Sequence, residues 1–467
     1  YSILSLLNHY YFKTYALDLG VYTNALYDYI HFQWNDSCVF KENAENLLAD
    51  HFDLYLMIFS PLCLVFKTYT LLIVQVISVL AGGIGIYKYF TVVNNKLALY
   101  ATVYFYLFYG IYTALAFDYH SNVVAAMIVP WFFYFFKQKK YAASSIAFVF
   151  ILISKENISL WIAFICLGLL FEFRKDKISI RYLFIFFSIT VMYFIFVVEV
   201  IMPGLSRNGI YPHFNYSHIG NSPSEALKYL IIHPSETIKT LFVNHTNNPA
   251  GNYVKAEMHL LVLFSGLYML FFKPYYLIML IPIYFQKLFN NNISMWGING
   301  QYSIEFIPIL TIGAFSVLNE FKNMKRAKIT AIVVLTGCLI STIRVMDHTV
   351  FINTDTDRIR IYKADHYKGK YNADLVHEQL NNIPETAIVS AQYPFVPHLA
   401  LRDNIYQFPI IKDAEYIVYS LKENTYPISR KEFNSKTDAL LISGEWLIHF
   451  NNEDIVILKR KNVQMSH

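Results

Sequence analysis

The stretch "YTLLIVQVISVLAGGIGIYKYF", residues 69–90, decides the fold class, because it is long, apolar and carries a single charge. A helix needs about 20 consecutive apolar residues to cross the hydrocarbon core of a bilayer. Two further stretches have the same character, "YLFIFFSITVMYFIFVVEVIM" at 182–202 and "ITAIVVLTGCLISTIRVM" at 329–346. The sequence therefore predicts a polytopic α-helical membrane protein.

The composition of the whole chain agrees with this class. Of 467 residues, 55% are hydrophobic and only 15% are charged, with a mean hydropathy of +0.36. A soluble globular chain carries roughly 25% charged residues. The net charge of +5 is therefore interpreted as a signal of membrane topology, and no nucleic-acid partner is expected. The four cysteines have no CxxC spacing, so they indicate neither a disulfide scaffold nor a zinc site.

Basic residues mark one side of the predicted bundle. We expect about eleven spans, at residues 1–12 (the end of a truncated span), 69–89, 97–117, 121–137, 141–154, 157–172, 180–202, 255–272, 274–289, 302–319 and 328–346. The connections on one side collect Lys88, Lys96, Lys137, Lys139, Lys140, Arg174, Lys175, Lys177, Arg181, Lys273, Lys322, Lys325, Arg326 and Lys328. Because basic loops stay in the cytoplasm, this side is predicted to be cytoplasmic.

This topology predicts two domains. Residues 1–346 form the transmembrane domain, with outer loops at 13–68 and 203–254. Residues 347–467 are expected to form a small α/β domain outside the cytoplasm. Short β-rich runs, "ETAIVSAQY", "AEYIVYSL", "EWLIHF" and "DIVILKRK", indicate its strands, and "KYNADLVHEQLNNIP" indicates a helix.

The outer loops contain helical signals of their own. In the first loop, "LDLGVYTNALYDYIHF" has helical spacing and is expected to lie in the membrane interface. The run "HFDLYLMIFSPLCLVF" is too short to cross and is interpreted as re-entrant or interfacial. In the second loop, Ser222, Pro223 and Glu225 form a capping-box pattern that predicts a surface helix.

Ionisable and polar residues gather at the predicted outer ends of the spans. They come from five separate segments: Asp18; His51; Asp118 and His120; Lys155 and Glu156; Gln301 and Tyr302. Taken singly, each is more simply explained as a solvated loop residue or a local salt bridge. Charged groups near a membrane are nevertheless costly, and their convergence on one face favours a functional site.

These segments resemble those of known membrane proteins. An acidic residue after the first span, the "HFDLYLMIFSPL" segment, an acidic turn after the third span and the "SKEN" turn resemble the GT-C membrane glycosyltransferases in position. The motifs "DLGVYTNALY", "FDYHSN", "KENISL" and "IVSAQYPFVPHLALRDNIYQFP" resemble a bacterial predicted-membrane-protein family of unknown function. This second likeness extends over nearly the whole chain.

The GT-C resemblance implies a reaction. A sugar would move from a polyprenyl-phosphate carrier in the membrane lipid to an unknown acceptor on the outer face of the cytoplasmic membrane. Asp18 matches the acidic residue that acts as catalytic base in that fold. His51, His120 and Lys155 would stabilise the leaving phosphate, and Asp118 would orient a histidine or help bind a metal.

Several features of this assignment stay open. Asp118 and His120 are the expected ligands of a possible divalent metal, Mg²⁺ or Mn²⁺, although an Asp-Tyr-His sequence replaces the carboxylate pair of the resembled fold. Glu156, Gln301 and Tyr302 are expected to contact the substrate. A lipid or solute transporter, or a non-catalytic protein of cell-envelope assembly, would also place charges in a membrane cavity.

Overall fold

The computed structural model describes residues 1–351 and 355–461, and it is mainly helical with one small sheet near the C-terminus. The chain forms two compact units. The terminal unit combines Tyr1–Leu48, Tyr55–Val74 and Ile361–His467, and the helical unit combines Ala49–Leu54 with Gln75–Arg360. Each unit is described by itself below. The predicted domain boundary at residue 346 depends on membrane topology and stays a prediction.

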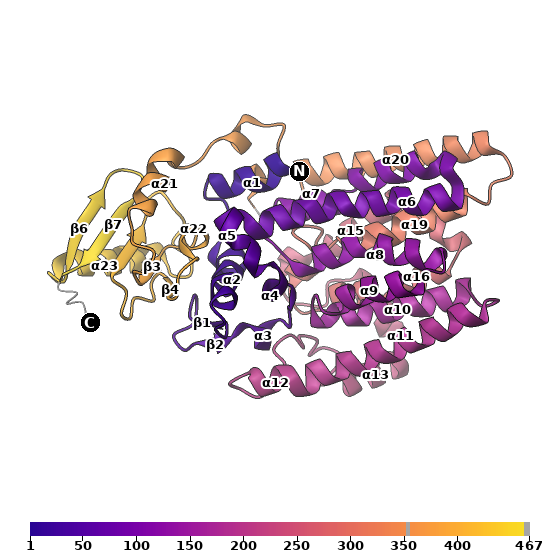
Figure 1. Ribbon diagram of the computed structural model, residues 1–467, viewed down its shortest axis with the longest axis horizontal. Coiled ribbons are helices and arrows are strands. Elements are labelled where there is room, and N and C mark those ends of the chain that lie inside the picture. Colours follow the sequence, from indigo (N-terminus) through magenta and orange to yellow (C-terminus); the bar gives the residue numbers. More distant parts are fainter. Residues whose placement is uncertain (352–354, 462–467) are drawn as a thin grey trace. The chain divides into compact units, whose positions relative to one another are not determined.

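The first half of the helical unit is a series of apolar helices of different lengths. They are α6 (Thr70–Leu107), α7 (Tyr109–Leu115), α8 (Ser121–Lys137), α9 (Tyr141–Leu152), α10 (Glu156–Glu172) and α11 (Lys177–Phe196), followed by η4 (Val197–Ile201) and α12 (Met202–Leu205). Figure 1 shows α8, α9, α10 and α11 running beside one another. Because consecutive helices joined by short turns run antiparallel, the turns that carry Asp118 and Lys155 lie at the same end of their helices.

Helix α6 is a hairpin of two arms and not one continuous rod. Asn94 has φ −162° and ψ 97°, which interrupts the helical backbone. The Tyr106 hydroxyl donates to the Leu80 carbonyl at 2.7 Å, across the two arms. A Cβ added at Gly83 would lie 2.1 Å from the Tyr106 ring, so glycine permits this close approach. The predicted boundary between the spans 69–89 and 97–117 agrees with this turn.

The second half of the helical unit contains shorter helices. They are α13 (Pro223–Ile232), α14 (Pro234–Phe242), α15 (Val254–Phe264), η6 (Leu267–Phe272), α16 (Tyr275–Ile278), α17 (Ile281–Leu288), α18 (Ile293–Trp296), α19 (Phe306–Leu318) and α20 (Met324–Asp347). The Ser222 hydroxyl accepts from the Glu225 amide at 3.3 Å, which confirms the predicted cap of α13.

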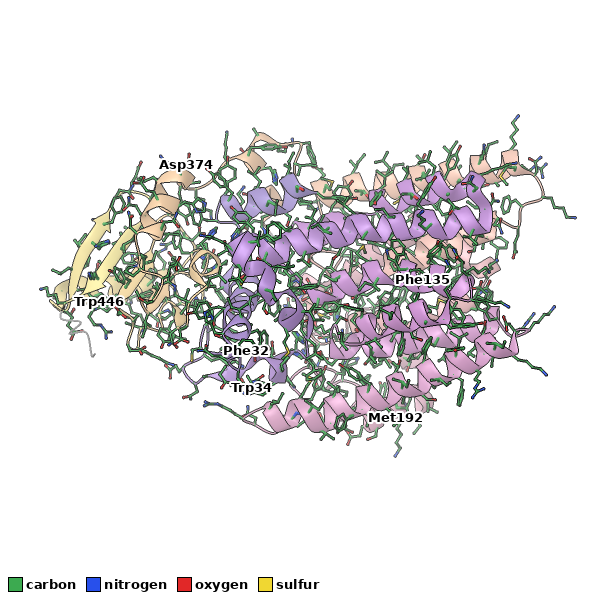
Figure 2. The ribbon with its side chains drawn as sticks, in the orientation of Figure 1. Phe32, Trp34, Phe135, Met192, Asp374 and Trp446 are labelled. Atoms are coloured by element: carbon green, nitrogen blue, oxygen red, sulfur yellow. The ribbon has the colours of Figure 1, made fainter. Side chains whose placement is uncertain are left out.

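Three helical segments within the described residues are long and apolar enough to cross a membrane: Tyr55–Leu107, Lys177–Leu205 and Met324–Asp347. Apolar side chains on α11 are exposed, and Figure 2 shows Met192 pointing outward. The Met192 side chain is 71% exposed. An exposed apolar surface of this kind is more stable in contact with lipid than in contact with water. The structure thus supports a helical membrane protein, but the predicted number of about eleven spans is not confirmed, because most expected spans are helices too short by this measure.

The N-terminal part of the terminal unit is helical. It contains α1 (Ser2–Tyr10), η1 (Ala16–Gly20), α2 (Val21–Ile30), α4 (Tyr55–Phe59), η2 (Ser60–Leu62), α5 (Cys63–Phe66) and η3 (Lys67–Tyr69), with a small ladder of β1 (Asp36–Ser37) and β2 (Glu45–Asn46). Helix α2 confirms the helix predicted in the first outer loop. Its Asn24 amide donates to the carbonyls of Ala400 and Arg402, so the two ends of the chain pack together within this unit.

The C-terminal part of the terminal unit is built on a mixed sheet with the order β4-β3-β5-β7-β6. Its strands are β3 (Val389–Ala391), β4 (Ile405–Gln407), β5 (Tyr416–Tyr419), β6 (Trp446–Asn451) and β7 (Val456–Arg460). Strands β3, β4 and β5 are parallel, and β7 pairs antiparallel with β5 and β6. The four predicted strands are confirmed, whereas β4 was not predicted.

Helices complete this region. Helix α21 (Ala373–Asn381) confirms the predicted helix, and α22 (Val396–Leu399) follows β3. Helix α23 (Arg430–Ile442) places Phe433 against Phe408, Ile417 and Trp446 in one apolar core.

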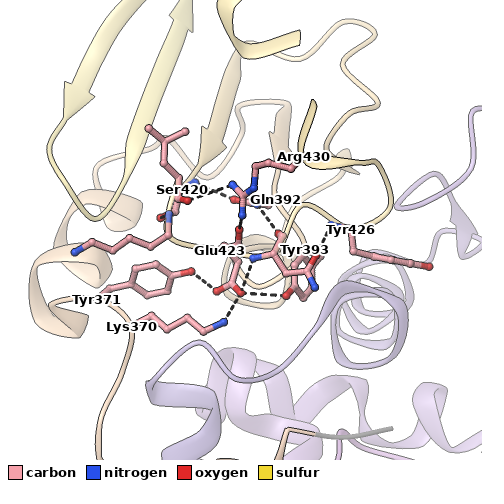
Figure 3. Close-up of polar contacts among 11 residues, drawn as sticks. Lys370, Tyr371, Gln392, Tyr393, Ser420, Glu423, Tyr426 and Arg430 are labelled. Atoms are coloured by element: carbon pink, nitrogen blue, oxygen red, sulfur yellow. Dashed lines mark hydrogen bonds and ion pairs between the residues drawn. The ribbon is translucent and has the colours of Figure 1, made fainter. Parts of the chain in front are cut away.

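A buried carboxylate ties the loops of this region together. Glu423 is 2% exposed and accepts hydrogen bonds from the Tyr371 hydroxyl at 2.5 Å and the Tyr393 hydroxyl at 3.1 Å. Its backbone carbonyl accepts from Arg430, and its carboxylate also pairs with Lys370 (Figure 3). Each contact satisfies a polar atom that burial would otherwise leave unsolvated, so Glu423 fixes the loop before α23.

Candidate functional site

The turn between α7 and α8 carries a buried ion pair. The Asp118 carboxylate accepts from the Arg358 guanidinium at 2.8 Å, and both side chains are 1% exposed. The guanidinium also lies over the Phe117 ring, with 5.4 Å between the guanidinium carbon and the ring centroid. Arginine suits this position because it stays charged and both pairs and stacks. The charge of Asp118, which burial alone would make costly, is therefore balanced within the helical unit.

His120 is also buried in this turn. Its amide donates to the Gln75 side chain at 2.9 Å, and its ring stacks on Phe117 with centroids 5.4 Å apart. Its Nδ1 lies 3.2 Å from the Asp118 backbone carbonyl. The Asp118 carboxylate pairs with Arg358, and the metal-binding role predicted for Asp118 and His120 stays a prediction.

The start of α10 places a second buried carboxylate. Lys155 is the N-cap of this helix, and Glu156 is its first residue. Glu156 is 1% exposed and accepts from the Phe52 amide at 3.1 Å and from His51 Nδ1 at 3.2 Å. A carboxylate at a helix N-terminus is favoured by the helix dipole. The structure thus joins His51 to Glu156, two residues that the sequence placed in separate segments.

The Lys155 ammonium stands out from the other cations of the site. Within residues 1–351 and 355–461, it makes no hydrogen bond or ion pair. Its charge acts on the carboxylates of Asp50, Glu156 and Glu305, so it lies among three acidic groups. An ammonium without a direct partner retains all of its donors for a bound anion.

The residues before α19 form the third turn of the site. The Glu305 carboxylate accepts from the Asn122 amide at 2.7 Å, which links this turn to the start of α8. The Tyr302 backbone carbonyl accepts from the Lys287 ammonium at 2.9 Å. Gln301 is buried. Glu305, before α19, therefore binds Asn122 at the start of α8. Its carboxylate also interacts electrostatically with Lys155 at the start of α10.

Two residues that sequence reasoning did not select complete the cluster beside Glu156. His213, in the irregular segment between α12 and α13, has its Nε2 3.3 Å from the Asp50 carboxylate. Its ring stacks on His51, with centroids 4.1 Å apart and an interplanar angle of 14°. Burial alone would raise the pKa of Asp50, but the bond to His213 and the charges around it hold that pKa below its usual range.

Asp18 lies in the terminal unit. It occupies η1, a turn of π-helix, and is half-buried. A Cβ at Gly20 would lie 2.9 Å from Val396, so this turn packs tightly against α22. π-Helical turns occur frequently at functional sites. The placement of Asp18 beside the residues of the helical unit stays a prediction.

The sequence signals for these residues differ in strength. Asp118, His120, Lys155 and Glu156 interrupt apolar runs and could be selected for that reason. Arg358 and His213 belong to polar segments, where an arginine or histidine is ordinary. Only the tertiary contacts show that they belong to the clusters.

A cavity that the structure describes lies elsewhere. It measures about 1090 Å³ and is lined by the end of α10 and the start of α11, including Arg174, Lys175 and Lys177. Glu156 and Glu172 are at opposite ends of α10, about 24 Å apart at 1.5 Å per residue. The predicted site residues therefore do not line this cavity.

Comparison with known proteins identifies the family. Residues 8–457 match the family described as "Predicted membrane protein (DUF2079)", so the chain belongs to this family. The resemblance to a predicted-membrane-protein family of unknown function is thereby confirmed. No curated protein matches the chain.

Proposed function

We propose that this member of the DUF2079 family is a GT-C-type glycosyltransferase with about eleven spans in the bacterial cytoplasmic membrane. It would move a sugar from a polyprenyl-phosphate donor to an acceptor on the outer face, where residues 347–467 would also lie. The observation that carries the proposal is the Lys155 ammonium, which has no direct partner in the described residues and lies beside His51 and Glu156.

The cluster around Lys155 suits a phosphate leaving group. A departing lipid phosphate gains negative charge, and a preorganised cation stabilises that charge. The nearby carboxylates offset the charge of Lys155, which limits the cost of keeping an ammonium at the membrane surface. A lipid-linked donor also explains why such a cluster stands at the end of apolar helices.

Asp18 is the proposed base. Its carboxylate would accept the proton of the acceptor hydroxyl as that oxygen attacks the sugar carbon and the carbon–phosphate oxygen bond breaks.

The first test concerns Lys155. The protein is reconstituted in nanodiscs with polyprenyl-phosphate donors, and sugar transfer and donor binding are measured. Lys155→Ala should lower transfer by at least about 100-fold and weaken donor binding. Lys140→Ala is a matched control, because Lys140 is likewise the N-cap of a helix, α9, and is exposed. Equal activity of the Lys155→Ala and Lys140→Ala variants would exclude this role.

The second test concerns Asp18. Asp18→Asn keeps the shape and removes the basicity, so transfer should fall by roughly 10²–10⁴-fold while donor binding persists. Asp438→Asn, on the exposed face of α23, is the control for loss of one carboxylate. A parental rate in folded Asp18→Asn would remove Asp18 from the mechanism. Movement of lipid or solute by a parent protein without transfer would favour a transporter.

A further inference from the structure

The group formed by Asp50, His51 and His213 has the composition and spacing of a metal site. One oxygen or nitrogen atom from each side chain lies within 4.8 Å of the corresponding atoms of the other two. His213 Nε2 and the Asp50 carboxylate oxygen are 3.3 Å apart. Two ligands on one tetrahedral ion, with bonds of about 2.0 Å, are separated by about 3.3 Å.

Glu156 gives this group the support that metal-binding histidines commonly have. Its carboxylate holds His51 Nδ1 at 3.2 Å, which leaves the opposite ring nitrogen available as a ligand. Glu156 is itself fixed by the Phe52 amide and is 1% exposed. A carboxylate that holds one imidazole nitrogen orients the other nitrogen toward a metal.

The three ligand side chains are partly exposed. The exposed fractions of the side chains are 38% for Asp50, 34% for His213 and 19% for His51, so an ion can enter from the surface. The His51 and His213 rings are stacked. Metal binding would replace the 2.7 Å contact between His213 Nε2 and the Asp50 backbone carbonyl with a metal–nitrogen bond.

We propose that Asp50, His51 and His213 bind a divalent transition-metal ion of the Zn²⁺ type, with Glu156 as the positioning residue for His51. Two imidazoles and one carboxylate favour such an ion over Mg²⁺ or Ca²⁺, which prefer oxygen ligands. The site differs from the one predicted at Asp118 and His120. The ion joins the segment before α4 to the loop before α13, and its fourth position stays open.

The test is direct measurement of Zn²⁺ in the full chain, purified with an affinity tag that contains no histidine and stripped with a chelator. Zn²⁺ is then added, counted by mass spectrometry, and its affinity is measured by competition with a chromophoric chelator. One ion per chain is expected. His213→Ala and Asp50→Asn should each weaken binding by at least about 100-fold, and Glu156→Gln by about 10–100-fold.

His233→Ala is the matched control, because His233 is an exposed histidine of the same outer loop, and it should bind Zn²⁺ like the parent. Thermal unfolding without metal shows whether each variant folds. If Glu156→Gln does not fold, His213→Ala still tests the site, because His213 lies in an irregular segment outside the helices. Absence of stoichiometric Zn²⁺, or unchanged binding in folded His213→Ala and Asp50→Asn, would overturn the site. Because the readout is metal content, the result is independent of sugar transfer.

Discussion

Arg358 donates to the Asp118 carboxylate at 2.8 Å across 240 positions of sequence, and the pair is shut off from solvent. This contact joins the turn before α8 to the segment after α20. A buried pair of this kind contributes little net stability compared with apolar residues of the same volume, but the loss of one partner leaves an uncompensated charge. Arg358 therefore places a compensating positive charge beside the Asp118 carboxylate inside the helical unit.

Breaking this pair should destabilise the protein strongly. Arg358→Ala is expected to lower the free energy of unfolding by about 3–5 kcal/mol, measured by thermal or denaturant unfolding in detergent. Adding Asp118→Asn should recover part of the loss, because the stranded charge is removed. Lys239→Ala, which breaks the exposed Lys239–Glu236 pair, should change stability by about 1 kcal/mol or less. Equal effects of the Arg358 and Lys239 variants would contradict this account.

Asp28 should make stability depend on pH. Burial, together with the charges of Asp403 and Asp36, raises the pKa of Asp28 to about 8. Between about pH 4 and pH 8 the folded state holds a proton that the unfolded state has lost, so stability falls as pH rises through this window. Asp28→Asn removes this effect and should be more stable than the parent by roughly 1–3 kcal/mol above pH 8.

The comparison across pH is the measurement that checks this prediction. The stability difference between Asp28→Asn and the parent should shrink toward zero near pH 4 and grow with pH. Asp438→Asn, an exposed carboxylate on α23, should show no such trend. A difference that stays constant from pH 4 to pH 8 would mean that Asp28 does not titrate within the window.

Membrane topology is the third prediction. A cysteine introduced at Asn382, an exposed residue after α21, should react with an impermeant thiol reagent added to intact cells. Cys38 is changed to serine first, since it is only half-buried, whereas the other three cysteines are buried. A cysteine at Lys140, on the side rich in basic residues, should be protected. Reactivity at Lys140 with protection at Asn382 would invert the proposed orientation.

The sequence predicted elements best where a single apolar run has clear ends. The span expected at 121–137 matches α8, because a polar turn precedes it and Lys137 closes it. The spans expected at 255–272 and 274–289 divide into short helices instead. Gly266 has φ +110°, a conformation that favours glycine, and prolines stand at 274 and 282. The prolines and the glycine break the helix, although both stretches are apolar enough over their whole length to resemble single spans.

The site was predictable only where a polar residue interrupts an apolar context. Lys155 and Glu156 had that signal, and so did Asp118. The partners that define their chemistry, His213 and Arg358, are separated from them by long stretches of chain and have no local pattern. A single sequence carries no information on such pairings, because they depend on how helices assemble and not on local periodicity.

The hairpin of α6 bears on how the chain enters a membrane during synthesis. Its two arms are joined at Asn94, and the Tyr106 hydroxyl of one arm bonds to the Leu80 carbonyl of the other. Lipid offers no hydrogen-bond partner to that hydroxyl, whereas the neighbouring arm does. The glycine at position 83 lets the two arms approach this closely. We therefore expect both arms to insert together as a hairpin, because this bond forms only when the two arms are side by side.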